Sequence, residues 1–354
     1  MTRNVLAAAA LGILLQILGL AGCAGNGGPT SPNTPSGGNG NAVTGRITDA
    51  VDGSQVGSAT VQMSGTQATS SGDGSYSITV ASSGPVATTI QAGGYLQRET
   101  HVRVSGGTTA NLTLIPSGKG FDLNFFDHVF RNKGSDGTTR WQTAPAFEIW
   151  PQLHTCEPPP SSAGEVACAQ VRVQNSVSSA FQDLAQQVIA SDASQLTGGF
   201  IASPSVSVQM HPAGTLLTQN DFLKNAVVVI MQVDKVAAAA SSAEWKYDAA
   251  TRSTLAADIQ IIPADAAVRF VHSHELAHTV GYNHPDGQAA VPVASIMGSG
   301  AVSQPSSADM LHGRILYLRP PNSRSPDKDP DSFTVNVLAA TAGGAGPTRI
   351  VSVQ

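Results

Sequence analysis

The chain has 354 residues, 12% of them are Asp, Glu, Lys or Arg, and its formal net charge at pH 7 is -5. This length exceeds what one hydrophobic core usually organises, which predicts two domains and further segments outside them. The sequence has no basic region of the kind that binds nucleic acid, so we expect no nucleic-acid partner.

The first segment, residues 1–22, has the pattern of a signal peptide. Arg3 supplies a positive charge, and residues 5–20 are almost all apolar. The run ends in the letters LAGC, which resemble the bacterial lipobox, and this resemblance implies a lipid on Cys23. We therefore expect an exported protein anchored in a bacterial cell envelope, and Ala24 after the cysteine favours the outer membrane. An ordinary signal peptide with a chance cysteine is the alternative.

The next two segments differ sharply in composition. Residues 23–41 are nearly all Gly, Pro, Ser, Thr and Asn, which predicts a flexible linker. Residues 42–117 contain short alternating runs separated by turn residues, which predicts an antiparallel β-sandwich of immunoglobulin or transthyretin type. The order of these runs, from VTGRITDAVDG to THVRV, resembles carboxypeptidase regulatory-like domains. That resemblance implies a non-catalytic spacer or binding module.

Residues 118–325 combine longer helical patterns with apolar strands, which predicts an α+β domain. The expected strands cover residues 146–149, 206–210, 226–233 and 257–262, and the expected helices cover 171–190, 266–280 and 307–318. Residues 326–354 form a C-terminal extension, which either adds a strand to this domain or is loosely attached.

Cys156 and Cys168 form an even pair in a chain that is expected to leave the cytoplasm. A disulfide bond between them is therefore expected. A metal site is the alternative, but no further ligands lie near them at zinc-site spacing.

The motif H-E-x-x-H-x-x-G-x-x-H, at residues 274–284, contains the candidate metal ligands and the candidate catalytic residue. His274 and His278 are four residues apart, so on a helix their imidazoles lie on one face and can bind one ion. Gly281 permits a reversal of the chain, which brings His284 back as a third ligand. Three protein ligands leave one position of a tetrahedral zinc ion open for water, and Glu275 is placed to take a proton from that water.

The full motif resembles the metzincin zinc peptidases, and the letters SIMG, which contain Met297, resemble their methionine turn. The resemblance implies a zinc endopeptidase with protein or peptide substrates, a catalytic Glu275 and a structural Met297. It also implies that residues 257–262 form the edge strand along which a peptide lies. The predicted fold is thus a multidomain chain, an all-β sandwich followed by an α+β metzincin-like domain.

Two other functions remain possible at this point. One is a zinc-binding surface adhesin or binding lipoprotein without turnover, against which the intact Glu275 argues. The other places the main function in the β-sandwich of residues 42–117, as a peptidoglycan or carbohydrate module.

Overall fold

The computed structural model describes residues 40–159, 167–235, 240–285, 294–298, 302–335 and 347–353. By its contacts the chain divides into Met1–Asn39 and a second unit, Gly40–Gln354, to which the following description is confined. The predicted signal peptide, Cys23 and nearly all of the predicted linker lie outside the described residues. Within the described part of the chain, no helix has both the length and the apolar character needed to cross a membrane.

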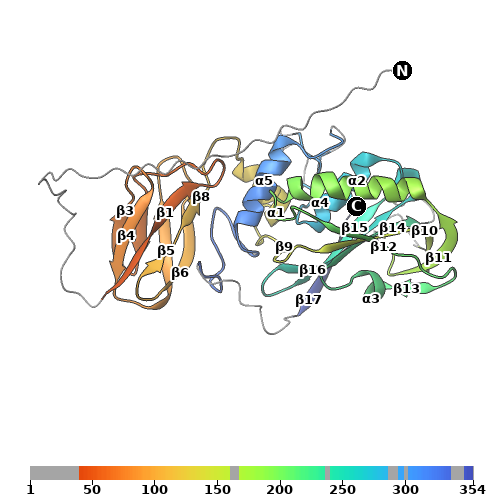
Figure 1. Ribbon diagram of the computed structural model, residues 1–354, viewed down its shortest axis with the longest axis horizontal. Helices are drawn as coiled ribbons and strands as arrows, with labels where there is room; N and C mark the ends of the chain where they lie inside the picture. Colours follow the sequence, from red (N-terminus) through yellow and green to blue (C-terminus); the bar gives the residue numbers. More distant parts are fainter. Residues whose placement is uncertain are drawn as a thin grey trace, which may run out of the picture. The chain divides into compact units, whose positions relative to one another are not determined.

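Two four-stranded sheets form the first part of the second unit (Figure 1). Alternating residues of their strands are buried, as in Tyr76, Ile78 and Val80, and together they form one apolar core. The first sheet contains β1 (Asn41–Asp49), β4 (Ser75–Val80), β7 (Thr108–Thr109) and β8 (Leu112–Leu114). The second contains β2 (Thr60–Met63), β3 (Thr66–Thr69), β5 (Gly84–Gln91) and β6 (Arg98–Val104).

A nine-stranded sheet dominates the rest of the unit, in the order β13-β11-β10-β14-β16-β15-β17, with β12 paired to β10 and β9 paired to β16. Its central strands β10, β14 and β16 run parallel, and β14 and β16 are almost fully buried. β15 and then β17 add antiparallel. The strands are β9 (Arg140–Trp141), β10 (Ala146–Cys156), β11 (Gln170–Val177), β12 (Ser205–Val208), β13 (Leu216–Thr218), β14 (Val227–Asp234), β15 (Ser242–Asp248), β16 (Ser253–Ile261) and β17 (Thr348–Val353).

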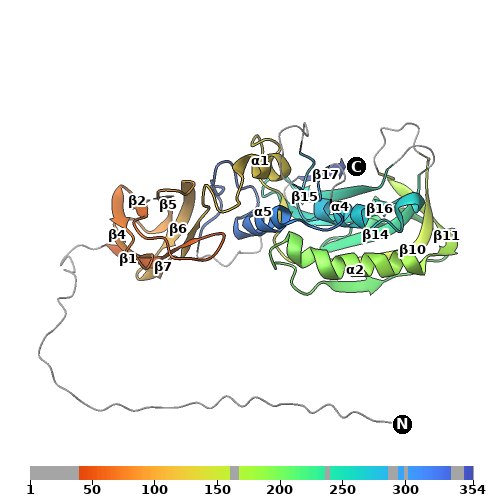
Figure 2. The ribbon, with the colours of Figure 1, turned by 90° about the horizontal axis from the view of Figure 1, so that it is seen from above.

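Two helices, α2 (Ser179–Leu196) and α4 (Arg269–Thr279), lie along one face of this sheet (Figures 1 and 2). The buried side of α2 includes Phe181, Ala185 and Val188, whose spacing places them on one helical face. The other helices are α1 (Leu123–Arg131), α3 (Gln219–Phe222), the 3-10 turn η1 (Pro263–Asp265) and α5 (Ser307–Leu318).

The predicted α+β class of residues 118–325 is wrong. A nine-stranded sheet organises this region, and together with the two sheets of residues 41–114 it makes the described unit mostly β. One cause lies in the helix predicted over 171–190. Its first part alternates with a period of two and forms β11, and α2 begins only at Ser179, after its N-cap Ser178. β15 was not predicted, and β17 was covered only by the alternative that residues 326–354 add a strand to this domain, which they do.

The predicted edge strand is also wrong. Residues 257–262 overlap β16, which pairs with β14 on one side and β15 on the other. The sheet ends instead at β17, near the C-terminus of the chain. An interior strand and an edge strand can have the same apolar sequence, and sequence alone did not distinguish them.

Candidate metal centre

Helix α4 places the first two histidines of the motif one turn apart. The Nε2 atoms of His274 and His278 are 3.2 Å from each other. The helix ends at Thr279, and Gly281 then adopts φ 111°, where a side chain is strained. A Cβ atom on Gly281 would also lie 2.4 Å from the carbonyl oxygen of Thr139. This residue must therefore be glycine for both conformational and steric reasons.

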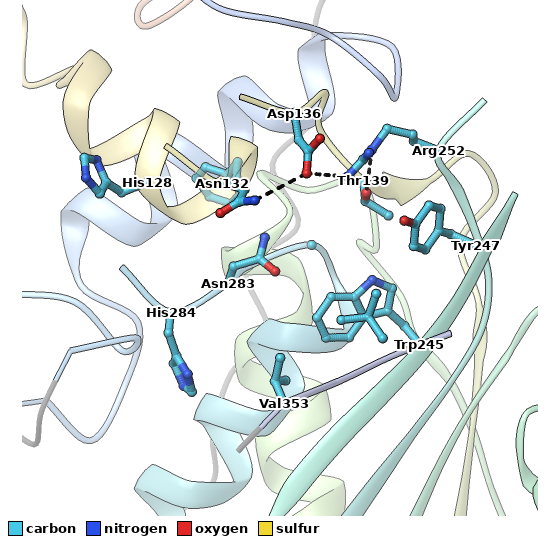
Figure 3. Close-up of a pocket in the computed structure, with 13 residues that line it drawn as sticks. His128, Asn132, Asp136, Thr139, Trp245, Tyr247, Arg252, Asn283, His284 and Val353 are labelled. Atoms are coloured by element: carbon cyan, nitrogen blue, oxygen red, sulfur yellow. Dashed lines mark hydrogen bonds and ion pairs between the residues drawn. The ribbon is translucent and has the colours of Figure 1, made fainter. Parts of the chain in front are cut away.

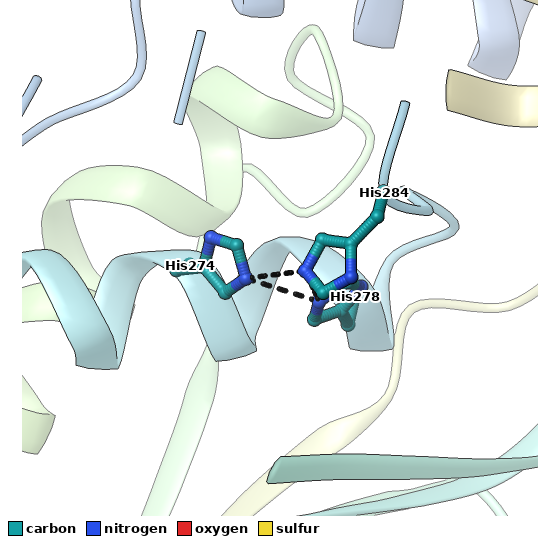
Figure 4. A group of neighbouring side chains, drawn as sticks. All are labelled: His274, His278 and His284. Carbon is teal, nitrogen blue, oxygen red and sulfur yellow. Dashed lines mark hydrogen bonds between the residues drawn. The ribbon is translucent and has the colours of Figure 1, made fainter. Parts of the chain in front are cut away.

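The turn after α4 returns His284 to the other two histidines (Figure 4). Asn283 fixes this turn, because its backbone N–H and its Nδ2 both donate to the carbonyl oxygen of Val129 on α1, at 2.8 and 3.0 Å. The Nε2 atom of His284 then lies 2.9 Å from that of His274 and 3.2 Å from that of His278. The structure thus brings all three predicted ligands to one point, and among the described residues they form the one group of this kind.

Backbone carbonyls fix which nitrogen of two rings carries the proton. Nδ1 of His274 lies 2.8 Å from the carbonyl oxygen of Ile296, and Nδ1 of His278 lies 2.8 Å from that of Tyr282. A carbonyl oxygen only accepts, so each Nδ1 is the donor and each Nε2 of the neutral ring presents a lone pair. The Nε2 contact between these two rings therefore cannot be a hydrogen bond.

This arrangement fits a cation. Three imidazole ligands at 2.0–2.1 Å from a tetrahedral zinc ion would lie about 3.3 Å apart, close to the observed spacing. Burial lowers the pKa of His274 to about 4 and that of His278 well below its usual value, which keeps both rings neutral, as metal ligands must be.

Glu275, the predicted catalytic residue, lies beside the histidines on α4 and is 3% exposed. Burial raises its pKa to about 8, although the charge of Lys235 opposes this shift. Among the described residues its Oε2 atom has no hydrogen-bond partner. A buried carboxyl oxygen without a partner is what a cation, or a donor group on a bound ligand, would satisfy.

The predicted methionine turn is held by a residue that sequence reasoning missed. Met297 is 3% exposed and belongs to the main apolar core. Asp309 accepts hydrogen bonds from Ser295 Oγ at 2.5 Å and from the N–H of Ile296 at 2.8 Å, and so positions the carbonyl that bonds to His274. Asp309 also completes the capping box of α5 with Ser306, an S-x-x-D signal that is visible in the sequence.

A pocket of about 390 Å³ opens beside His284 (Figure 3). One wall carries Trp245, which stacks on the His278 ring at 6.2 Å between centroids and 12° between planes. Polar groups line another part of it, and Arg252 faces Asp136 there at 3.7 Å. This pocket could not be predicted from the sequence, because its walls come from segments far apart in the chain.

The remaining predicted site residues lie elsewhere. Cys156 and Cys168 are joined by a disulfide bond, with their Cα atoms 5.5 Å apart. Cys23 falls outside the described residues.

Comparisons with known proteins give limited likenesses. No family model matches the chain, and no curated protein matches it. One similar solved structure is a mutant type II cohesin–X-dockerin complex from Acetivibrio cellulolyticus, with 22% identity over 21% of this chain and 57% of that chain and a TM-score of 0.18. A putative carbohydrate binding protein from Bacteroides uniformis has 21% identity over 21% of this chain and 41% of that one, with a TM-score of 0.19.

A third similar structure is a putative membrane-associated protein of unknown function from Bacteroides fragilis. Its identity is 16% over 47% of this chain and 46% of that chain, with a TM-score of 0.19. The chain thus spans between 41% and 57% of these three structures. At TM-scores this low, the likenesses assign no ligand to this chain.

These comparisons correct the predicted family and activity. None of the three structures is described as a metallopeptidase, so the assignments to metzincins and to carboxypeptidase regulatory-like domains are not upheld. The predictions that the chain is a zinc endopeptidase, a hydrolase and a metalloprotease are not upheld either. The motif predicts where three imidazoles meet. It does not by itself establish turnover.

Proposed function

We propose that this chain is a zinc-binding protein in which His274, His278 and His284 hold one ion, and that it binds a ligand without hydrolysing it. One observation carries the proposal. The Nε2 lone pairs of His274 and His278 face each other at 3.2 Å, with the Nε2 of His284 beside them. Two such lone pairs repel each other, and a cation bound between them would replace this repulsion by attraction. Zinc suits a set of three neutral imidazoles.

The chain's own residues would bind the ligand around the ion. Bound zinc supplies one position for an oxygen or nitrogen atom of the ligand. The Oε2 atom of Glu275, which has no partner among the described residues, would accept a hydrogen bond from the ligand. Trp245 adds an aromatic ring to the lining of the pocket. Asn132 and Asn283 line the same pocket with amide groups. Aromatic faces pack on C–H groups and amides bond to hydroxyls, so a carbohydrate is the ligand class we propose.

Zinc content tests the metal site. The purified full chain is expected to hold one zinc ion, measured by plasma emission after dialysis, and His278→Ala is expected to hold less than a tenth of that. His272→Gln is the matched control, because His272 lies on the same helix but its Nε2 bonds to the carbonyl oxygen of Ala266. Equal zinc content in His278→Ala and the parent chain would contradict the ligand assignment.

Ligand binding tests the second half of the proposal. Zinc-loaded chain is expected to bind members of a glycan array, and binding should disappear in His278→Ala. A denatured protein mixture incubated with the chain should show no new peptide termini. Termini that appear with the parent chain and not with Glu275→Gln at equal zinc content would contradict a function without turnover.

We also propose, from the sequence, that a lipid on Cys23 anchors the chain in the outer membrane of a bacterial envelope. Cells that express the full chain with an alkyne-labelled fatty acid should label the parent chain but not Cys23→Ser. The variant should appear in the soluble fraction. Labelling of both chains would contradict a lipid at this residue.

A further inference from the structure

The last described strand, β17, occupies the edge of the sheet next to the histidine cluster. It pairs antiparallel with β15 over six residues, from Ala243 opposite Val353 to Asp248 opposite Thr348. In the order of the sheet β17 is terminal, so within the described chain β15 is its one partner strand. Without β17, the outer N–H and C=O groups of β15 would be an unpaired edge.

Two side chains of β17 enter the pocket beside His284. Val351 and Val353 are two residues apart, so they point to the same face of the strand. Both are partly buried against the main core, and both line the pocket together with Trp245 and His284. Figure 3 shows Val353 between the labelled His284 and Trp245. The strand therefore fills space that a ligand of this pocket would need.

β17 buries far less side-chain surface than β15, the strand with which it pairs. No residue from Thr348 to Val353 is fully buried, and Ile350 is 47% exposed. In contrast, every residue of β15 except Lys246 is buried. An edge strand with so little buried apolar surface belongs to the part of a fold that opens at the lowest cost in free energy.

We infer that β17 is a displaceable occupant of this groove, and that its release opens the pocket and controls access to the histidine cluster. The groove consists of the β15 edge and the pocket beside His284. The strand that fits it is extended and places β-branched apolar side chains at alternate positions, as Val351 and Val353 do. The inference rests on the proposed function only where it concerns access to the metal.

Three full-length variants test whether β17 can be displaced from the β15 edge. Ile350→Pro with Val351→Pro opens the groove, because successive N–H groups alternate in direction and one of the two faces β15. Ile350→Thr with Val351→Thr is its matched control, since it keeps both N–H groups and the branched side chains. Lys246→Cys with Ile350→Cys locks β17 in place through a disulfide, because these residues are opposite each other.

The first measurement uses a fluorescent synthetic peptide with the sequence PTRIVSVQ, which copies residues 347–354. Fluorescence anisotropy is expected to show that it binds the double-proline variant at least tenfold more tightly than the double-threonine control. The oxidised double-cysteine variant should not bind it. Equal binding to the open and locked variants, or no binding to the open variant, would overturn the inference.

The second measurement follows removal of zinc by a chelator. Extraction should be at least tenfold faster from the double-proline variant than from the locked variant, and equal rates would overturn control of access. If no variant holds zinc, the proposed function fails. The peptide measurement would still decide whether β17 can be displaced.

Discussion

Asp309 links the N-terminus of helix α5 to the orientation of His274, one of the three proposed metal ligands. Its carboxylate holds the N–H of Ile296, whose carbonyl bonds to Nδ1 of His274, and it also caps α5. Groups that orient a ligand from behind typically contribute 10- to 100-fold to metal affinity. The sequence predicted His274 as a ligand but did not predict this support.

Asp309→Ala is expected to weaken zinc binding by about 10- to 100-fold, measured by competition with a chromophoric chelator. Ser306→Ala is the control, because it removes the other half of the α5 capping box and leaves Ser295 and Ile296 bonded. Loss of the cap alone costs about 1 kcal/mol of stability. If both variants lose the same affinity, Asp309 acts through α5 and not through Ile296.

Gly281 is predicted to be the least replaceable glycine of the site. Gly281→Ala should lower the free energy of unfolding by about 1–3 kcal/mol, because the backbone has φ 111° and the new Cβ meets the Thr139 carbonyl. Urea denaturation measures this. Gly53→Ala is the matched control, since Gly53 also has positive φ but faces open space. Equal losses would mean that the close approach to Thr139 contributes nothing.

At the scale of residues, the sequence predicted the parts of the site that are local. The spacing of His274, His278 and His284 and the role of Gly281 follow from helical geometry and a turn, which a sequence displays. Trp245 could not be predicted, because it reaches His278 from a strand about thirty residues earlier in the chain. Such contacts depend on how the sheet is ordered.

Helices α2 and α4 are joined by one buried carboxylate. Asp192 on α2 is 1% exposed, and it accepts a hydrogen bond from Ser273 at 2.6 Å and from Arg269 at 2.8 Å, both on α4. Because α4 carries two of the three proposed metal ligands, this contact fixes the helix on which the candidate site is built.

Asp192→Ala should lower the free energy of unfolding by about 3–5 kcal/mol, because it leaves the polar groups of Arg269 and Ser273 without their buried partner. Chemical denaturation monitored by circular dichroism measures the loss. Asp183→Ala, an exposed change on the same helix, should stay within about 0.5 kcal/mol of the parent chain. Similar losses of unfolding free energy in the two variants would contradict the proposed role of Asp192 in holding α4 against α2.

At the scale of elements, prediction worked where a segment was strongly patterned. The helix over 307–318 coincides with α5, and the strand over 226–233 nearly coincides with β14. Prediction failed for β11, because its alternating valines merge with the helical spacing of α2. An added strand was one of the two alternatives for residues 326–354, but β17 itself was not located, because a partly exposed edge strand has little apolar periodicity.

Across the whole molecule, buried charges tie residues after α5 to the rest of the unit. Asp327 pairs with Arg319 at 2.6 Å, and both side chains are fully buried. A second ion pair joins Asp329 to Arg98 of β6 at 2.8 Å, and its side chains are at most 6% exposed. The sequence placed these residues only at the end of the predicted domain and in a C-terminal extension, because a sequence does not show which charges become buried.

Zinc binding should stabilise the whole unit. A ligand that binds only the folded state at 100 times its Kd adds about 2.7 kcal/mol to the free energy of unfolding. The melting temperature of the metal-free chain is therefore expected to rise when zinc is added, as measured by calorimetry. His278→Ala should show no rise. A rise of the same size in that variant would place the stabilising ion elsewhere.

X-ray absorption at the zinc edge tests the central claim most directly. The zinc-loaded full chain is predicted to show imidazole nitrogen ligands at about 2.0–2.1 Å and a further light atom, with no sulfur. Sulfur scattering at about 2.3 Å, or a spectrum without imidazole that persists in His278→Ala, would contradict a site built from His274, His278 and His284.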